Sequence, residues 1–263
     1  MTVLHHCVSV VAVTPEQFGQ LAESVLDFAQ STRSRGEAIA VEDGRTVPDV
    51  RLVKGRHLRP GARYDLSHAG GTGTAVLAIQ QWQRGRSIAV EQVVTSDEGT
   101  TRTAVRLRAP DRPRLLEADI RVRGSQPLRR VAGKGQVDLA AWWTAAALTP
   151  GTPPTAHAPA TARLSHPLGR ARLHLRPRRA RDGRWEVGVT VAVNGRWLLR
   201  PLAAFALMVA GRPVRREFRS AVEQAAGAWD QAIGELLALS PDELRARLTR
   251  LATERTEHEP PAP

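Results

Sequence analysis

The sequence contains one cysteine, Cys7, among 263 residues. A single thiol cannot form an internal disulfide, and zinc sites usually need more soft ligands than one cysteine supplies. The HExxH, paired-cysteine and GxSxG patterns of metalloproteases, zinc modules and α/β-hydrolases are also missing from the sequence. We therefore expect a disulfide-free cytoplasmic protein without a metal or another cofactor, and no motif identifies a reaction.

Long apolar runs are missing too. The longest strongly apolar run beyond the N-terminus, residues 201–211, is far shorter than the roughly 20 residues of a membrane-spanning helix. Residues 1–13 carry neither a basic leader nor a small-residue cleavage pattern. The sequence thus predicts a soluble protein that has no transmembrane segment and is not exported.

Lysine is nearly absent, because Lys54 and Lys134 are the only lysines among 38 basic residues. The formal net charge is +12 and the isoelectric point is about 11.4. Such a charge normally indicates nucleic acid or an anionic membrane as the partner. The preference for arginine runs through the whole chain, however, which favours a compositional bias over a dedicated phosphate-binding surface. We do not expect nucleic acid as the partner, but an arginine-driven binder stays as the competing hypothesis; it predicts one contiguous basic face.

The N-terminal half reads as a strand, a helix and a series of strands. Residues 3–13 alternate and are rich in valine, which predicts a strand. Thr14, Pro15 and Gln17 then form a helix start close to a capping box. After Gly36 the apolar residues recur at every second position, which predicts an antiparallel meander. Its expected strands are residues 38–42, 50–56, 62–68, 74–83, 87–94, 101–108, 115–123 and 129–137.

The C-terminal half predicts a short helix, a loop, a hairpin and two helices. Residues 138–148 form the short helix, and residues 149–162, rich in proline, threonine and alanine, form a flexible loop. Residues 171–175 and 185–193 alternate as a hairpin. A continuous apolar stripe from Val214 to Leu237 predicts a long helix, and Ser240 and Glu243 cap another. We expect residues 255–263 to be disordered.

This order of elements resembles the helix-grip fold of the SRPBCC (START/Bet v 1-like) superfamily, which includes polyketide cyclases. The resemblance is carried by residues 8–16, Gly61-Ala62-Arg63-Tyr64, residues 79–89 and residues 187–218. It implies an α+β fold in which a curved antiparallel sheet wraps around a long C-terminal helix. Residues 1–239 would form that single domain with an insertion at residues 115–162, and residues 240–254 would add a helix.

Family members bind hydrophobic small molecules between the sheet and the helix, and some catalyse cyclisation or dehydration there. Tyr64 and His68 share a strand face by alternation, which makes them candidates for a catalytic acid and base. The alternative interpretation is that Tyr64 and His68 are a half-exposed pair at the edge of the sheet with no catalytic role. Glu186 is the third catalytic candidate, as a cavity carboxylate with a raised pKa, although pairing with an arginine is the other reading.

The ligand-binding candidates are aromatic or apolar. Trp82 with Gln80 suits the recognition of a flat ring, unless Trp82 belongs to the core. Phe218, Val222 and Trp229 lie on the stripe of the long helix. For Trp142, next to Trp143, three interpretations are open: a lid over the cavity, a contact with a partner, or a small separate core under the insertion.

The leading hypothesis is therefore a protein that binds a hydrophobic, aromatic or polycyclic small molecule, with or without cyclase-like acid/base chemistry. A non-catalytic carrier is one alternative, and the arginine-driven nucleic-acid binder is the other. The sequence leaves the oligomeric state open.

Overall fold

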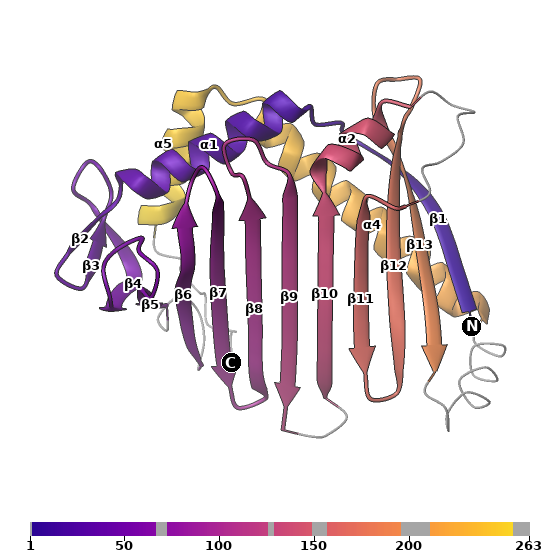
Figure 1. The fold of residues 1–263 in the computed structure, drawn as a ribbon, viewed down its shortest axis with the longest axis horizontal. Coiled ribbons are helices and arrows are strands. Elements are labelled where there is room, and N and C mark those ends of the chain that lie inside the picture. Colours follow the sequence, from indigo (N-terminus) through magenta and orange to yellow (C-terminus); the bar gives the residue numbers. More distant parts are fainter. Residues whose placement is uncertain (1, 67–72, 126–128, 149–156, 196–210, 255–263) are drawn as a thin grey trace, which may run out of the picture.

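The computed structural model describes residues 2–66, 73–125, 129–148, 157–195 and 211–254. Its strands form one antiparallel sheet of 13 strands in the order β1-β13-β12-β11-β10-β9-β8-β7-β6-β5-β4-β3-β2 (Figure 1). The strands are β1 (Thr2–Val10), β2 (Arg33–Arg35), β3 (Ala38–Ala40), β4 (Thr46–Lys54), β5 (Arg63–Asp65), β6 (Thr74–Gln83), β7 (Ser87–Ser96), β8 (Gly99–Arg108), β9 (Leu115–Gly124), β10 (Arg130–Asp138), β11 (Ala160–His166), β12 (Gly169–Arg179) and β13 (Trp185–Gly195). The helices are α1 (Pro15–Ser31), α2 (Leu139–Ala146), α4 (Gly211–Leu237) and α5 (Pro241–Thr253).

The predicted helix-grip fold, with a curved sheet wrapped around a long C-terminal helix, is wrong. The antiparallel strands after Gly36 form as expected, but they join into a single sheet that β1 extends by pairing with β13. The apolar stripe of α4 forms the predicted helix, yet α4 packs on one face of the sheet only at the end formed by β1, β13 and β12. The stripe defines which face of the helix is buried and leaves the partner strand undefined, which is why the prediction failed.

Both predicted capping boxes are present. The Thr14 hydroxyl accepts a hydrogen bond from the Gln17 amide, and Ser240 does the same for the Glu243 amide. Each box satisfies amide groups that the first turn of a helix leaves without a partner. Helix α1 then runs from the β1 side of the molecule toward β2, where it contacts α5 (Figure 1).

The two faces of the sheet differ because side chains alternate along each strand. One face, here called the helix side, packs against α2 and α4 and holds a buried cluster around Val10, Trp185, Val187 and Val189. A second buried cluster, with Ile39, Ala62, Tyr64 and Ile79, lies toward the opposite end of the sheet. The other face, here called the outer face, points away from the helices.

Strands β9 and β10 lie in the middle of the sheet, although both belong to the stretch expected as an insertion. Helix α2 follows β10, and Asp138 accepts the amide hydrogen of Ala141 as its N-cap. Strand β11 contradicts part of the loop expected at residues 149–162, since Ala160 to Ala162 pair with β10. The proline-rich composition of that stretch hid the beginning of a central strand. The predicted disordered tail, residues 255–263, lies outside the described residues.

Candidate functional site

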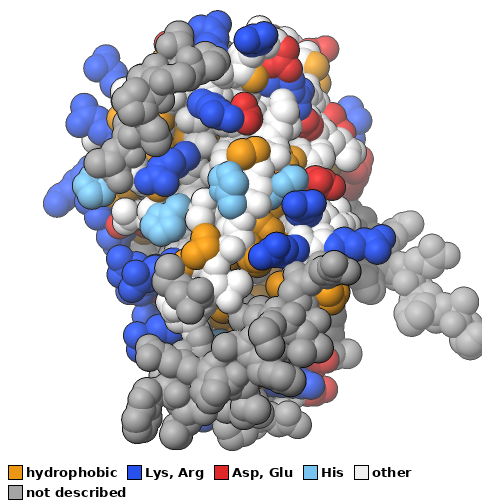
Figure 2. Space-filling model, turned by 90° about the vertical axis from the view of Figure 1, so that its right-hand side faces the viewer, with side chains coloured by type: hydrophobic (Ala, Val, Ile, Leu, Met, Phe, Trp, Pro, Cys, Tyr) orange, Lys and Arg blue, Asp and Glu red, His pale blue; other side chains and the backbone are white. Residues whose placement is uncertain are grey.

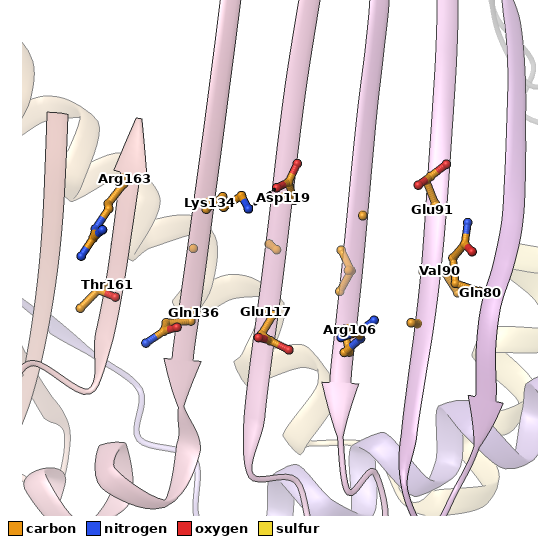
Figure 3. Close-up of a pocket in the computed structure, with 15 residues that line it drawn as sticks. Gln80, Val90, Glu91, Arg106, Glu117, Asp119, Lys134, Gln136, Thr161 and Arg163 are labelled. Carbon is orange, nitrogen blue, oxygen red and sulfur yellow. Dashed lines mark ion pairs between the residues drawn. The ribbon is translucent and has the colours of Figure 1, made fainter. Parts of the chain in front are cut away.

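The outer face carries an open groove of about 740 Å³ across β6 to β11 (Figure 3). Two cross-strand rows of side chains form its floor, since residues paired in an antiparallel sheet lie on the same face. One row contains Glu91, Ala104, Asp119, Lys134 and Arg163, and the other contains Ala89, Arg106, Glu117, Gln136 and Thr161. The polar side chains of both rows project from the strands in Figure 3.

The carboxylates of the groove are already paired with cations. Glu91 lies 2.5 Å from Arg102, and Glu117 lies 3.1 Å from Arg108. Asp119 contacts both Arg121, at 3.2 Å, and Lys134, at 3.6 Å. Among the described residues, no carboxylate pairs with Arg106 or Arg163. The groove therefore presents free guanidinium groups and amide or hydroxyl donors, a combination that favours an anionic ligand over an apolar one.

The positive charge continues beyond the groove over the rest of the outer face. Figure 2 looks at the β1 edge and shows Lys and Arg side chains along the left of the view, where this face is seen in profile. Register places twelve basic side chains on the outer face of β7–β13: Arg102, Arg106, Arg108, Arg121, Arg123, Arg130, Lys134, Arg163, Arg170, Arg172, Arg176 and Arg178. The acidic side chains on the same strands and face are Glu91, Glu117, Asp119, Asp138 and Glu186.

The helix side of the same central strands is apolar and carries a floor of small residues. Ala118, Gly135 and Ala162 are paired across β9, β10 and β11. In the next row, Ile120 and Leu164 lean over Gly133, where an added Cβ would lie 2.8 Å from Ile120 Cγ2 and 3.3 Å from Leu164 Cδ1. The small-residue floor, Ala118, Gly135 and Ala162, is bordered by these apolar walls.

The walls are unusually exposed for large apolar side chains. Val105 is 36% exposed, Ile120 39% and Leu164 45%. Neighbouring exposed apolar side chains of this kind mark interaction or ligand-binding surfaces. Helix α2, with Trp142, contacts β9, β10 and β12 beside this region.

Tyr64, a predicted catalytic residue, lies in the core beside His57. Its hydroxyl is 2.9 Å from His57 Nδ1, and the Leu58 amide donates to the same hydroxyl at 2.9 Å. His57 Nε2 is 2.9 Å from the Thr32 hydroxyl, which donates to the Ala29 carbonyl at 2.6 Å. Since Thr32 uses its proton on Ala29, His57 donates from Nε2 and accepts from Tyr64 at Nδ1.

This chain of hydrogen bonds is closed within the protein. Burial lowers the pKa of His57, although an interaction with the Thr32 backbone opposes this shift. Burial raises the pKa of Tyr64, and the hydrogen bond from the Leu58 backbone opposes that shift. Both shifts favour the neutral forms. The geometry joins the end of α1 to β5. His68, the predicted partner of Tyr64, lies outside the described residues.

Glu186, the third catalytic candidate, lies on the outer face 2.5 Å from Arg178. The arrangement matches the salt-bridge alternative for this residue. Of the remaining histidines, His5 is 3.1 Å from the Thr190 hydroxyl on the outer face, while His6 contacts Glu223 of α4 on the helix side. The two rings therefore point to opposite faces.

The predicted ligand-binding residues are scattered over the fold. Gln80 lines the outer groove, whereas Trp82 packs against the second core cluster and its buried indole N–H has no hydrogen-bond partner among the described residues. Phe218 and Val222 pack against the first core cluster. Trp229 donates its indole N–H to the Val11 carbonyl at 3.0 Å. Trp142 packs edge-on against Trp185 at 5.6 Å between ring centroids.

The sequence reasoning missed His57 and the polar rows of the groove. The rows had a signal, because charged residues occupy every second position of residues 117–123, and three of the four alternate positions 102, 104, 106 and 108. That alternation predicts one charged face on each strand. It does not reveal which residues lie beside each other, since this depends on the register between strands.

Comparisons with known proteins assign no family to the chain. No protein-family model matches it, and neither does any curated protein. Among solved structures, it is similar to the crystal structure of DynU16, a protein of the dynemicin biosynthetic locus, at 12% identity over 95% of this chain and 94% of that one. The TM-score of this match is 0.23. Among the described helices, none has the length and apolar character needed to cross a membrane.

Proposed function

We propose that this protein binds a small molecule with an apolar ring or chain on the helix side of the sheet, over the small-residue floor. The observation that carries the proposal is the pairing of this floor with the exposed side chains of Val105, Ile120 and Leu164. A floor without bulky side chains leaves room for a flat or extended ligand. Its apolar walls supply the surface against which that ligand is buried.

Burial of an apolar group at such a surface favours binding. An aromatic group buries about 150–250 Å² of surface, which corresponds to roughly 4–6 kcal/mol before the cost of lost ligand freedom. The described residues supply no carboxylate on the helix side of β8–β11. Tyr64 and His57 use their hydrogen-bonding groups on each other, on the Leu58 amide and on the Thr32 hydroxyl. We therefore propose binding and do not extend the proposal to a cyclisation or dehydration.

The test is a fluorescence titration with Nile red, a neutral apolar dye that the arginines do not attract. The wild-type protein should raise the dye fluorescence and shift its emission to shorter wavelengths. Gly135→Leu fills the floor, where an added Cβ meets only Ala162 Cβ at 3.6 Å and the Thr161 carbonyl at 3.8 Å. This variant should weaken binding by at least about tenfold, or roughly 1.4 kcal/mol.

Ala132→Leu is the matched control, because Ala132 lies on the outer face of the same strand and is exposed. It should bind the dye like the wild type. Thermal melts of both variants establish that they fold. Equal binding by folded Gly135→Leu and Ala132→Leu proteins would place the dye elsewhere and refute the proposal.

A further inference from the structure

Three pairs of arginines lie directly opposite each other on neighbouring strands of the outer face. In one pair, Arg102 and Arg121, each arginine contacts a carboxylate. The other two pairs have no such contact among the described residues.

Arg123 of β9 is paired with Arg130 of β10, and Arg163 of β11 is paired with Arg172 of β12. All four side chains are exposed. Like charges directly opposite each other destabilise a sheet. The pairs Arg123–Arg130 and Arg163–Arg172 are therefore unfavourable contacts between like charges.

Neighbouring carboxylates do not relieve this repulsion. Within the described part of the chain, none pairs with Arg123, Arg130, Arg163 or Arg172. The acidic residues of this face contact other cations instead, as Glu91 does with Arg102 and Glu117 with Arg108. The two arginine pairs thus remain available to an external anion, and adjacent guanidinium groups match the oxygens of one phosphate.

We propose that the outer face binds the phosphate backbone of double-helical nucleic acid, with a phosphate at each of these two arginine pairs. The two pairs lie two strands apart across the sheet. They are also four residues apart along the strands, because the first pair includes Arg130 of β10 and the second lies in register with Lys134 of the same strand. Strand spacing and rise place them about 17 Å apart. This separation is comparable with the roughly 12 Å opening of a major groove once the flanking phosphate groups are included.

The polar groove lies beside these pairs and supports the same ligand. Arg163 belongs to both, and Gln136 and Thr161 add neutral donors along its floor (Figure 3). Contacts of this kind, from arginine, amide and hydroxyl groups to phosphate and sugar, position nucleic acid without reading its sequence. The interaction is therefore expected to be independent of base sequence and strongly dependent on salt.

The composition of the face favours a duplex over two other polyanions. On the described outer face of β7–β13 there is no Phe, Tyr or Trp on which an unpaired base could stack. From β8 to β13, Leu115 is the only large aliphatic side chain of that described face. Proteins usually bind a membrane surface through apolar side chains together with basic ones, and this face lacks the apolar side chains.

The experiment is fluorescence anisotropy of a labelled mixed-sequence DNA duplex of about 20 base pairs, titrated with the full chain at several salt concentrations. Non-specific binding at physiological salt has a Kd on the order of 10⁻⁴ to 10⁻⁶ M, and the logarithm of affinity falls linearly with the logarithm of salt. The double variants Arg163→Gln/Arg172→Gln and Arg123→Gln/Arg130→Gln should each weaken binding about tenfold and reduce the salt slope by about 2.

The matched control is Arg216→Gln/Arg219→Gln, which removes the same charge from exposed positions of α4. It should retain the wild-type slope and nearly the wild-type affinity. Each arginine-pair variant should also melt at a higher temperature than the wild type, since a like-charge repulsion is removed. This result establishes that weaker binding does not arise from unfolding.

Three outcomes would overturn the proposal. One is no anisotropy change at low salt, and another is an equal loss of affinity in the α4 control, which would indicate net charge alone. The third is tighter binding to phosphatidylserine vesicles or to a single strand of the same length than to the duplex. The Nile red titration is independent of these results, because the neutral dye and the small-residue floor belong to the opposite face.

Discussion

The Tyr64 hydroxyl donates to His57 Nδ1 across 2.9 Å and joins a strand of the sheet to the end of α1. The contact lies in a directional chain that begins at the Leu58 amide and ends at the Ala29 carbonyl. Tyr64 is 3% exposed, so its hydroxyl has little access to water. A buried polar group of this kind depends on its protein partners for every hydrogen bond.

Tyr64→Phe should therefore destabilise the protein. The variant removes one hydroxyl and leaves the Leu58 amide and His57 Nδ1 without their partner, which costs about 1–3 kcal/mol. Urea unfolding followed by tryptophan fluorescence measures the change. Thr190→Val is the control, because the Thr190 hydrogen bond to His5 is exposed and its loss should cost less than about 0.5 kcal/mol. Equal destabilisation by both variants would show that the buried hydrogen bonds of Tyr64 contribute no more to stability than an exposed one.

Stability should fall as the pH is lowered through the range in which histidine titrates. Burial lowers the pKa of His57 in the folded protein, so the unfolded chain takes up a proton first as pH falls below about 6.5. The contribution of His57 is complete above that pH and is lost below it. Urea midpoints at about pH 8 and about pH 5.5 should differ more for the wild type than for His57→Gln. Identical pH dependence in the two proteins would contradict the assigned role of His57.

The position of α4 along β1 depends on Asp230. Its carboxylate accepts the Val11 amide at 2.6 Å and pairs with Arg184, whose guanidinium also donates to the Ser9 hydroxyl at 2.9 Å. Asp230→Ala should cost about 1–3 kcal/mol, because the partly buried Val11 amide loses its acceptor.

Hydrogen exchange locates this effect. Amides of α4 should exchange faster in Asp230→Ala than in the wild type, while those of β6–β9 should be nearly unchanged. Glu223→Ala is the control, since its contact with His6 is at an exposed position of the same helix. If the two variants accelerate exchange in α4 equally, Asp230 is not the specific anchor.

Local structure was predictable where one residue pattern has one physical reading. The capping boxes at Thr14 and Ser240 define helix starts because each satisfies backbone amides within four residues. Alternation likewise predicted β6 with its observed bounds and the hairpin of β12 and β13. Strand β2 escaped, since its residues are all exposed and show no apolar alternation.

The arrangement of these elements was not predictable because it depends on contacts distant in sequence. The pairing of β1 with β13 joins residues about as far apart as Thr2 and Val193. Tyr64 was expected to work with His68 on the same strand face, whereas the structure brings it His57 from the preceding turn. That turn places Leu58 at a φ of 52°, a conformation that the sequence Arg-His-Leu-Arg gives no reason to expect.

Two glycines near this turn separate the effect of backbone strain from that of a steric clash. Gly55 and Gly61 have φ values of 84° and 87°, which side chains other than glycine rarely adopt. An added Cβ at Gly61 meets no atom within 4 Å, but at Gly55 it would lie 2.9 Å from Ala62 Cα and 3.0 Å from the Gly61 carbonyl oxygen. Gly61→Ala should therefore cost about 1–2 kcal/mol from backbone strain alone.

Gly55→Ala should cost clearly more than Gly61→Ala, because both of the atoms that its Cβ meets belong to the backbone and cannot rotate away. Ala62 is fully buried in the second core cluster, so the displacement also disturbs the packing around Tyr64. Urea unfolding of the two variants under the same conditions compares these costs directly. If the two variants lose the same free energy of unfolding, the backbone around Ala62 yields without cost, and the close packing of this turn does not hold β4 and β5 together.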